Sequence, residues 1–419
     1  MQTLVVFSHL RWNFVYQRPQ HLLSRLARRW RVVFVEEPVL KAGHNELERF
    51  DPAPNVQVWR PHVTGDAPGF HDDHLPALER MVSDAMSEEG IADYWVWFYT
   101  PMALPLATDL SPRGVVYDCM DELTLFKHAP RQLVQRENAL FKMADLVFTG
   151  GPSLYNSKRH RHPDVYCFPS SVDAQHFAEV KGEHPLLAGI ARPRLGYCGV
   201  IDERLNLGLI DAMAGQHPDW QLVMVGPVVK IDPATLPRRP NIHWLGQQTY
   251  DELPALISGW DVCLLPFALN DATRFISPTK TLEYMACGRP SVSTSIKDVV
   301  EPYGHVVSIA DTAEDFTAAC EAILRRSRDE QQEHAAVLAG IVARTSWDAT
   351  AAAMGELIAA ADRSRVDAGK VLAPHSAANA PTKHEGTPLH LADATAPVGV
   401  GNPASATAAA GAAKRASAA

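Results

Sequence analysis

Short apolar runs alternate with amphipathic stretches along the first 150 residues of the chain. The strand-like runs are residues 4–8, 31–35, 56–59, 94–99, 114–118 and 146–149. The helix candidates between them are residues 20–30, 75–87 and 129–143. In the first of these, Leu22, Leu26 and Trp30 share one face at helical spacing. Because buried strands that alternate with helices form parallel sheets covered on both faces, this half predicts a doubly wound α/β domain.

The same pattern begins again near residue 194 and predicts a second α/β domain. Its strand-like runs are residues 194–199, 221–226, 241–246, 261–265, 290–294 and 305–309. Its helix candidates are residues 205–214, 249–258, 278–286 and 312–325. Three of the strands end in a glycine, namely Gly199, Gly226 and Gly246. Glycine at such places indicates loops that a ligand or another stretch of backbone approaches closely.

These two patterns predict the domain boundaries. We place the first domain at residues 1–175 and the second at residues 190–345, with a glycine- and proline-containing linker between them. Residues 346–363 form a predicted helix that can pack back on the first domain. Residues 366–419 are rich in alanine, proline, glycine, serine and threonine without periodicity. Such a segment cannot offset its ordering entropy by apolar burial, so we expect a disordered tail.

The composition is that of a globular protein and excludes several classes of function. The formal net charge of −9 argues against a nucleic-acid partner, because such partners need a basic surface. Met1 leads directly into a strand without a signal-peptide pattern, and no apolar window reaches the roughly 20 residues of a membrane span. The six cysteines are scattered, which indicates free thiols in a reducing cytoplasm. His71 and His74 flank two aspartates, but this spacing matches no common metal site, so we expect no metal.

Residues 277–294 carry the most specific chemistry in the sequence. Pro278 suits a helix start, and the free N–H groups of a helix N-terminus can hold a phosphate. Lys280 adds a full positive charge there, and Glu283 lies on the same helix face, where it can accept hydrogen bonds from a pair of sugar hydroxyls. The alternative is an ordinary surface ion pair between Lys280 and Glu283. The flanking strands favour a site, since open α/β sheets bind ligands at the carboxyl ends of their strands.

Taken in order, the motifs of this chain resemble those of a known family. They are Gly199 with Arg204, the Val225-Gly226-Pro227 run, Gly246, Asp261 with Pro266, the 278–290 run that contains Lys280 and Glu283, and the opening segment 8–22. Over about residues 1–362 the chain resembles GT-B glycosyltransferases, in the style of glycosyltransferase family 4 and of bacterial exopolysaccharide and teichuronic acid transferases. The resemblance implies two Rossmann-like domains that face each other across a cleft.

The resemblance also implies an activity and a set of donor-binding residues. The activity is transfer of a hexose from a nucleotide-sugar, most often a UDP-sugar, to a saccharide or lipid-linked acceptor in cell-surface polysaccharide synthesis. The donor would be held by Gly199, Arg204, Gly246 with the base-bordering segment 245–248, Ser277, Pro278, Thr279, Lys280 and Glu283. Such enzymes usually need no metal or other cofactor, because the helix dipole and basic side chains neutralise the leaving diphosphate.

One departure from the family pattern bears on the catalytic residue. Many retaining members have a glutamate eight positions before the one matched by Glu283, and this chain has Phe275 there. Either Asp271 substitutes for it, or the enzyme inverts and uses a general base from the first domain. Asp121 and then Asp118 are the preferred candidates for that base, because they follow a strand at its carboxyl end; their alternative role is helix capping. His9, just after the first strand, is a further candidate.

The remaining polar groups of the first domain leave several interpretations open. Arg18 can contact the donor diphosphate or an acidic acceptor, or it can form a loop–helix salt bridge, and the loop around Trp12 resembles an acceptor wall. Two basic clusters, one of Arg25, Arg28, Arg29 and Arg31 and one at residues 158–162, can touch anionic lipid at the inner membrane surface or form solvated faces. We expect a cytoplasmic protein, with peripheral membrane contact as an option.

Two other functions are compatible with the same fold and nucleotide. One is a sugar-nucleotide epimerase of the GT-B type, which would act on the donor without an acceptor. The other is a non-catalytic subunit that binds a nucleotide-sugar, because the missing glutamate can mean lost catalysis. An oxidoreductase is disfavoured, since no Gly-x-Gly-x-x-Gly motif follows any strand.

Overall fold

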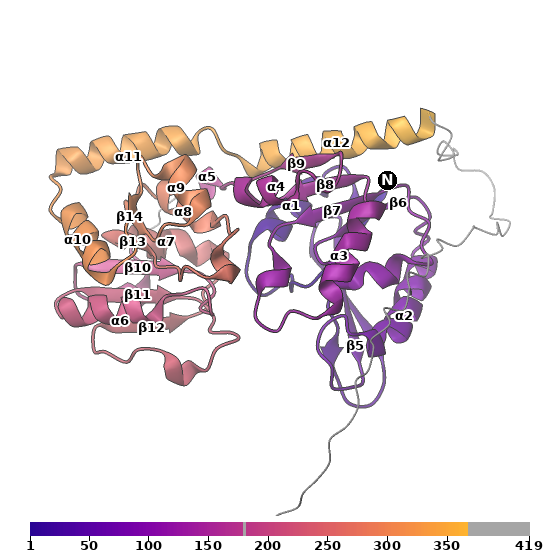
Figure 1. The fold of residues 1–419 in the computed structure, drawn as a ribbon, viewed down its shortest axis with the longest axis horizontal. Coiled ribbons are helices and arrows are strands. Elements are labelled where there is room, and N and C mark those ends of the chain that lie inside the picture. The colour runs from indigo at the N-terminus through magenta and orange to yellow at the C-terminus, as the bar shows by residue number, and fades with distance from the viewer. Residues whose placement is uncertain (179–181, 368–419) are drawn as a thin grey trace, which may run out of the picture. The chain divides into compact units, whose positions relative to one another are not determined.

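The computed structural model of this chain describes residues 1–178 and 182–367, and it contains two separate α/β sheets (Figure 1). The strands of the first sheet are β1 Thr3–Ser8, β2 Arg31–Glu36, β3 Val39–Leu40, β4 Glu46–Ala53, β5 Val56–Val63, β6 Tyr94–Phe98, β7 Val115–Cys119, β8 Leu146–Thr149 and β9 Val165–Cys167. Their order is β3-β5-β2-β1-β6-β7-β8-β9, with β4 paired antiparallel to β5. The other pairings between described strands are parallel, as the sequence predicts.

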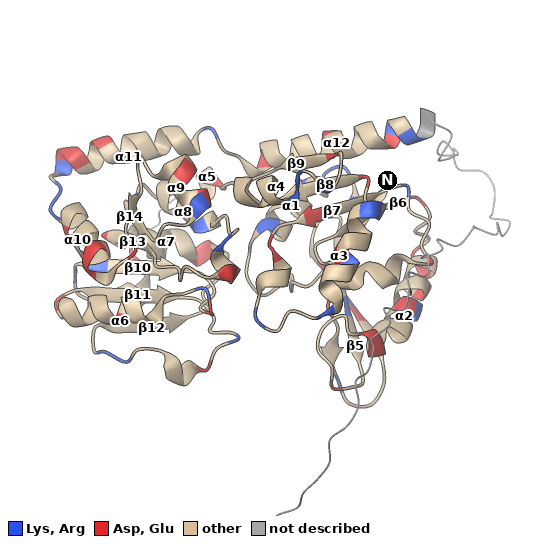
Figure 2. Ribbon diagram, viewed as in Figure 1, with Lys and Arg blue, Asp and Glu red and all other residues tan. Residues whose placement is uncertain are grey.

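The second sheet repeats this design with six parallel strands. They are β10 Arg194–Cys198, β11 Gln221–Val225, β12 Ile242–Gly246, β13 Val262–Leu265, β14 Ser291–Ser293 and β15 Ser308–Ile309. Their order is β12-β11-β10-β13-β14-β15. The strands β13 and β14 carry no charged residue (Figure 2), as expected for strands covered by helices on both faces. The expectation of two doubly wound sheets is thereby confirmed.

The helices follow the strands in the alternation that the sequence predicts. The α-helices are α1 Arg18–Leu26, α2 Leu75–Glu88, α3 Gln132–Met143, α4 Pro152–Lys158, α5 Ala174–Ala178, α6 Leu207–Gln216, α7 Leu253–Ser258, α8 Thr279–Ala286, α9 Lys297–Tyr303, α10 Ala313–Leu324, α11 Arg328–Val342 and α12 Trp347–Asp367. Short 3-10 helices lie at Asp72–His74, Pro101–Ala107, Leu123–Leu125, Pro185–Leu187, Pro233–Thr235, Tyr250–Glu252 and Asp271–Thr273.

Several elements were missed by the sequence analysis. They are β3, β4, β9, α4, α5, α9 and α11. The strand β4 was missed because it is half-exposed and polar, with two glutamates, an arginine and an aspartate in eight residues, so it has no apolar run. The helix α11 was missed because only Leu338, Ile341 and Val342 of its fifteen residues are buried, which is too narrow an apolar stripe to stand out.

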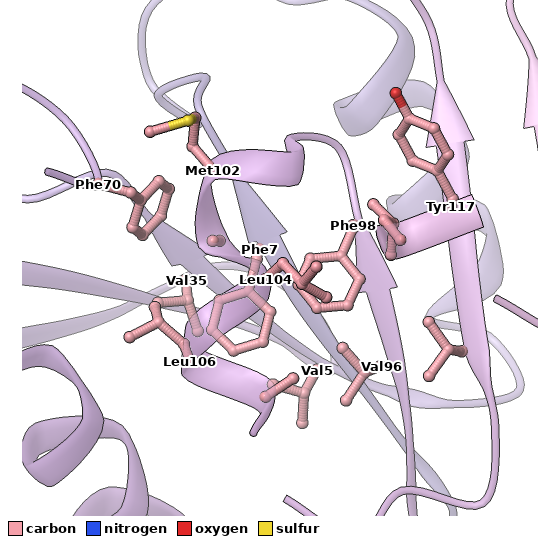
Figure 3. Close-up of a cluster of buried hydrophobic side chains, with 14 of the residues drawn as sticks. Val5, Phe7, Val35, Phe70, Val96, Phe98, Met102, Leu104, Leu106 and Tyr117 are labelled. Atoms are coloured by element: carbon pink, nitrogen blue, oxygen red, sulfur yellow. The ribbon is translucent and has the colours of Figure 1, made fainter. Parts of the chain in front are cut away.

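The core of each domain lies on both faces of its sheet. Along β1, Val5 and Phe7 point into one buried cluster, while Leu4 and Val6 point into another on the opposite face. Figure 3 shows the first cluster, in which the rings of Phe7 and Phe98 stack with centroids 5.4 Å apart. This burial fixes the strands, so the loops at their carboxyl ends start from rigid positions.

The last described helix, α12, packs on the first domain rather than on the second. Its side chains Trp347, Met354 and Ile358 are fully buried in the cluster that also contains Trp30 of the first domain. Asp362 near its end accepts hydrogen bonds from Arg113, with the shorter distance 2.8 Å. The helix extends to Asp367, four residues beyond the predicted end, and residues 368–419 of the predicted tail lie outside the described residues.

Two further expectations concern cysteines and membrane spans. All six cysteines are free, and Cys119, Cys198, Cys263 and Cys320 are buried. Among the helices of the described ranges, none is long and apolar enough to cross a membrane. The predicted domain boundaries at 175 and 190 stay a prediction.

Candidate functional site

The N-terminal turn of α8 places Lys280 against the loops that end the strands of the second sheet. The helix begins at Thr279 with Pro278 as its N-cap, so it starts one residue later than predicted. The Lys280 ammonium lies 2.7 Å from the Glu283 carboxylate. The pair is not on the surface, since the two side chains are only 13% and 4% exposed. Burial acts to lower the pKa of Lys280, but the Glu283 carboxylate holds it above the usual value. Lys280 is therefore a permanent cation at a helix N-terminus.

The glycines that end β10, β11 and β12 lie side by side. The Gly199 N–H donates to Val225 and the Gly226 N–H donates to Gly246, at 2.9 and 2.8 Å. A Cβ on Gly226 would stand 1.8 Å from the Gly199 carbonyl oxygen, so no other residue fits there without moving the backbone. Gly246 has a positive φ of 70°, which glycine adopts without strain. The glycine loops thus bring three strand ends close together beside Lys280.

A cavity of about 620 Å³ opens in front of these loops. Its lining comes from the loop after β1, from the strand ends of the second sheet and from the segment before α7, and comprises Trp12, Asn13, Phe14, Val15, Tyr16, Cys198, Gly199, Val225, Gly226, Pro227, Gln247, Gln248, Thr249, Tyr250, Glu252, Leu253 and Lys280. The rings of Tyr16 and Tyr250 stack with centroids 4.4 Å apart, so side chains of both domains close one end of it. The volume suits a nucleoside-sized ligand.

The loop after β1 is held in place by buried polar groups behind it. The Gln20 side chain donates to the carbonyl oxygens of Trp12 and Val15, at 2.8 and 3.1 Å. The fully buried Glu36 carboxylate accepts from the Trp12 backbone N–H at 2.7 Å. Trp12, predicted to belong to an acceptor wall or a donor-phosphate loop, lines the large cavity and is itself mostly buried. This loop is a rigid wall rather than a free lid.

A second, narrower cavity of about 140 Å³ adjoins the first, and the two share Val15, Tyr16, Gly199 and Lys280 in their linings. Its lining comprises Val15, Tyr16, Gln17, Arg18, Met120, Asp121, Gly150, Ser170, Tyr197, Gly199, Val200, Arg204, Phe267, Ile276, Ser277, Pro278, Thr279 and Lys280. The predicted phosphate-binding residues 277–280 therefore face the predicted base Asp121 across one small space. Lys280 stands where the two cavities meet.

Asp121 is the acidic residue in the lining of this narrow cavity. Desolvation raises the pKa of its carboxyl to about 6, against the opposing charges of Arg204 and Arg18. Among the described residues no side chain is hydrogen-bonded to this carboxylate. A carboxylate with a pKa just below neutrality is largely ionised at pH 7 and still basic enough to accept a proton.

Arg204 reaches the same cavity but is not a free cation. Its guanidinium donates to the Asp202 carboxylate, with the shortest distance 2.8 Å, and Asp202 is almost fully buried. The arginine remains charged, since guanidinium does not lose its proton in proteins. The sequence analysis missed Asp202, although an aspartate two residues before Arg204 could have indicated an ion pair.

Asp118, the second predicted base, has a different environment. It is fully buried, and the Arg18 guanidinium donates to its carboxylate at distances of 2.9 to 3.2 Å. Arg18 also donates to the Phe168 carbonyl oxygen at 2.7 Å. In the structure Arg18, at the start of α1, forms a salt bridge, which was one of its predicted roles. Its partner Asp118 lies near the end of strand β7. The Asp118 carboxylate is thus already paired and lines neither cavity, so Asp121 is the better placed of the two predicted bases.

His9, the further candidate base, lines neither cavity, so the geometry gives its predicted role no support. Burial and the charge of Lys230 lower the pKa of His9 to about 4, so its imidazole is neutral at pH 7 and a weak base. Its Nδ1 has no hydrogen-bond partner among the described residues.

Phe275, which stands where many retaining members have a glutamate, lines neither of the two cavities. Phe275 packs against the buried cluster of the first domain and lines a separate shallow hollow with Arg274. Asp271, considered as a substitute, is exposed and lines neither cavity. Asp271 is therefore not placed to act on a ligand in them.

Both predicted basic clusters have carboxylate partners. Arg25 and Arg28 pair with Asp348, Arg29 pairs with Glu356, and Arg31 pairs with Glu89. Three of these arginines thus tie α12 to the end of α1. In the second cluster Lys158 is buried between Glu122 and Glu137, at 2.7 and 2.9 Å. Lys158 is buried, whereas Arg28 and Arg29 keep 69% and 53% of their side-chain surface exposed, so membrane contact of the first cluster stays a prediction.

No group of three metal-ligating side chains occurs in the described ranges of the chain. The buried His74 uses its Nε2 on the Ala67 carbonyl oxygen at 2.7 Å, and the exposed His71 faces Asp73. Sequence reasoning also missed Tyr250 as a cavity residue, because an isolated aromatic residue in a loop shows no pattern until the fold brings it beside Tyr16.

Comparison with known proteins gives a family match for part of the chain and a fold for most of it. Residues 192–326 match the family model described as glycosyl transferases group 1. The chain is 26% identical over 258 residues to the putative teichuronic acid biosynthesis glycosyltransferase TuaH of Bacillus subtilis, an alignment that covers 56% of this chain and 64% of that protein. The match thus spans less than two thirds of that relative.

Solved structures with the same fold align over most of the chain. Sucrose-phosphate synthase from Thermosynechococcus elongatus superposes with a TM-score of 0.64 at 17% identity, covering 88% of this chain and all of that one. Anabaena HepE, solved in complex with UDP and glucose, gives 0.60 at 13% identity and covers 86% and 100%. A trehalose-6-phosphate structure from E. coli, bound with UDP-2-fluoro glucose, gives 0.62 at 12% identity and covers 86% and 99%. At these identities the likeness shows the fold, which is GT-B.

Proposed function

We propose that this chain transfers a hexose from a UDP-sugar to a saccharide or lipid-linked acceptor, because residues 192–326 match the group 1 glycosyltransferase model and the fold is GT-B. One observation carries the proposal: Lys280 stands at the junction of a nucleoside-sized cavity and a narrow cavity that contains Asp121. A diphosphate bridges nucleoside and sugar, so a cation at this junction meets the phosphates. The UDP-bound structures of the same fold support UDP as the nucleotide.

In this proposal the donor lies across both cavities. The uracil and ribose occupy the large cavity beside Gln247 and Gln248, and the diphosphate meets Lys280, Thr279 and the glycine loops. Glu283 lines neither cavity, so its first role is to hold the Lys280 ammonium at 2.7 Å; contact with the ribose hydroxyls requires the pair to open. The sugar then enters the narrow cavity near Asp121.

The reaction follows from these positions. The acceptor hydroxyl oxygen attacks the anomeric carbon of the sugar, its proton passes to the Asp121 carboxylate, and the bond from that carbon to the diphosphate oxygen breaks. The leaving UDP gains negative charge, which Lys280, Arg204 and the N-terminus of α8 stabilise without a metal ion. In-line attack with Asp121 as the base, opposite the departing diphosphate, would invert the configuration at the anomeric carbon. We place the reaction in the cytoplasm and in cell-surface polysaccharide synthesis.

The proposal is tested by donor binding and by product analysis. UDP should raise the melting temperature of the protein, and Lys280→Ala should abolish most of that shift, while Lys297→Ala, an exposed lysine on α9, should leave it unchanged. Absence of a shift with UDP, GDP and dTDP alike would refute a nucleotide-sugar function. Conversion of the donor into an epimer in the absence of an acceptor would instead establish an epimerase. Donor binding without any turnover would establish a non-catalytic subunit.

A further inference from the structure

A third cavity lies in the second domain and shares no lining residue with the two described above. It has a volume of about 130 Å³ and is built from the turn after α8, the end of α10 and one side of α11. The polar side chains in its lining are Asp261, Arg289, Arg326, Gln331 and His334. Figure 2 shows the blue positions on the segment that joins α10 to α11. The proposed transfer reaction uses none of these residues.

Three nitrogen atoms on residues that line this cavity are buried without a hydrogen-bond partner among the described residues. They are Nε of Arg289, Nη1 of Arg326 and Nε2 of His334. Arg289 is held in place by its Nη2, which donates to the Ser258 carbonyl oxygen. Buried polar groups are hydrogen-bonded in most folded proteins, so two unpaired guanidinium donors and an imidazole nitrogen, which donates when it carries the ring proton, point to an acceptor between them.

The charges around the cavity select an anion. Arg289 and Arg326 each carry a full positive charge. The carboxylate in the lining, Asp261, is already engaged, since it pairs with Arg192 and accepts from the Arg194 backbone N–H at 2.7 Å. Guanidinium groups bind oxyanions through charge-assisted hydrogen bonds, and phosphate offers several acceptor oxygens at once.

The size of the cavity limits what can enter. A volume of about 130 Å³ corresponds to about four water molecules, which is enough for one tetrahedral oxyanion and too little for a nucleotide. We propose that Arg289, Arg326 and His334 form a binding site for a single phosphate-sized oxyanion in the second domain. The site is independent of the proposed transfer reaction, so neither proposal depends on the other.

The position of this site links it physically to the donor cavity. Arg289 follows α8 directly, and its backbone N–H donates to Tyr284 of that helix at 2.9 Å. Lys280 lies in the first turn of the same helix, which is about 12 Å long at 1.5 Å per residue. An oxyanion at Arg289 therefore lies beside the turn that ends the helix whose N-terminus faces the donor cavity.

The experiment measures binding of inorganic phosphate at His334 itself, because phosphate can also enter the donor cavity. The imidazole NMR signal of His334, assigned by its loss in His334→Gln, should shift with phosphate in the wild-type protein and not with chloride at equal ionic strength. By calorimetry in saturating UDP, Arg326→Gln should weaken phosphate binding at least about tenfold. The matched control Arg328→Gln removes the same charge two positions away, outside the cavity, and should bind as the wild type does.

Two results would overturn the site. One is a His334 signal that does not shift at phosphate concentrations that saturate the binding measured by calorimetry. That result would mean that phosphate does not enter this cavity. The other is equal phosphate affinity in Arg326→Gln and Arg328→Gln, which would show a general salt effect. The NMR titration uses the unaltered protein, so it decides the question even where Arg326→Gln fails to fold.

Discussion

The loop after β7 and the first turn of α8 each present a charged residue to the narrow cavity with a second charged residue three positions away. In the first case Asp121 faces the cavity and Asp118 lies behind it; in the second Lys280 faces the cavity and Glu283 lies behind it. Lys280 and Glu283 pair with each other at 2.7 Å. Asp118 instead pairs with Arg18, a hundred residues away in the chain, whereas the Asp121 carboxylate has no hydrogen-bonded side chain beside it in the described part of the chain.

The difference decides what each charge can do. A cation paired to its neighbour stays charged at every physiological pH, which suits electrostatic binding of a diphosphate. A carboxylate without such a pair in a desolvated place has a raised pKa, which suits proton transfer near neutral pH. The same spacing of charged residues therefore serves binding in one region and, in our proposal, catalysis in the other.

Removing the Asp121 carboxylate should give the largest effect. Asp121→Asn keeps the shape but cannot accept the proton, so we expect transfer activity to fall by about 10²- to 10⁴-fold. The same variant should melt at a higher temperature at pH 7. Because folding raises the pKa of this carboxyl to about 6, its ionised form destabilises the fold, a cost that is complete above that pH and that the neutral amide removes.

Asp271→Asn is the matched control for this experiment, since it alters an exposed carboxylate that lines neither cavity. It should leave both activity and melting temperature unchanged. Full activity in Asp121→Asn would remove Asp121 from the mechanism and leave the donor site intact.

Breaking the pair of Arg18 and Asp118 should be the largest perturbation of stability. Asp118→Ala leaves the buried guanidinium uncompensated, and we expect a loss of about 3–5 kcal/mol in the free energy of unfolding, measured by urea denaturation. The double variant Arg18→Met with Asp118→Leu should recover most of it. Asp348→Ala, which breaks half-exposed pairs of α12, should cost about 1 kcal/mol or less. Similar losses in the two single variants would contradict a structural role for Asp118.

The same contrast explains which parts of the site could be predicted from the sequence. Lys280 and Glu283 were predictable because an i,i+3 spacing on a helix brings two side chains together without any tertiary information. The strand ends and glycine loops were predictable for a similar reason, since apolar runs and terminal glycines are local signals. Asp118 and Asp121 could be placed at a sheet edge and ranked with Asp121 first, but their different environments could not be predicted. Their difference comes from Arg18, which only the tertiary fold brings to Asp118, and from the desolvation that the same fold creates around Asp121.

The pH dependence of activity should follow Asp121. With a pKa of about 6, the base is about nine-tenths ionised at pH 7 and about one-tenth ionised at pH 5, so kcat should fall roughly tenfold between these values. The sign is fixed by the reaction, because only the ionised carboxylate accepts a proton. The residual activity of Asp121→Asn should show no such fall. A flat profile for the wild type would mean that another group takes the proton.

The smallest effects on stability and donor binding are expected for the pair of Lys280 and Glu283, which are neighbours on one helix. Glu283→Gln keeps a hydrogen-bond acceptor for the Lys280 ammonium, which is 13% exposed and remains in contact with the cavity. We therefore expect a loss of about 1 kcal/mol in the free energy of unfolding, well below that of Asp118→Ala. Donor affinity, measured by calorimetry with UDP, should fall by about fivefold because the lysine is less firmly held. A loss as large as that of Lys280→Ala would show that Glu283 itself binds the donor, and would move it from a positioning role to a direct contact with the ribose.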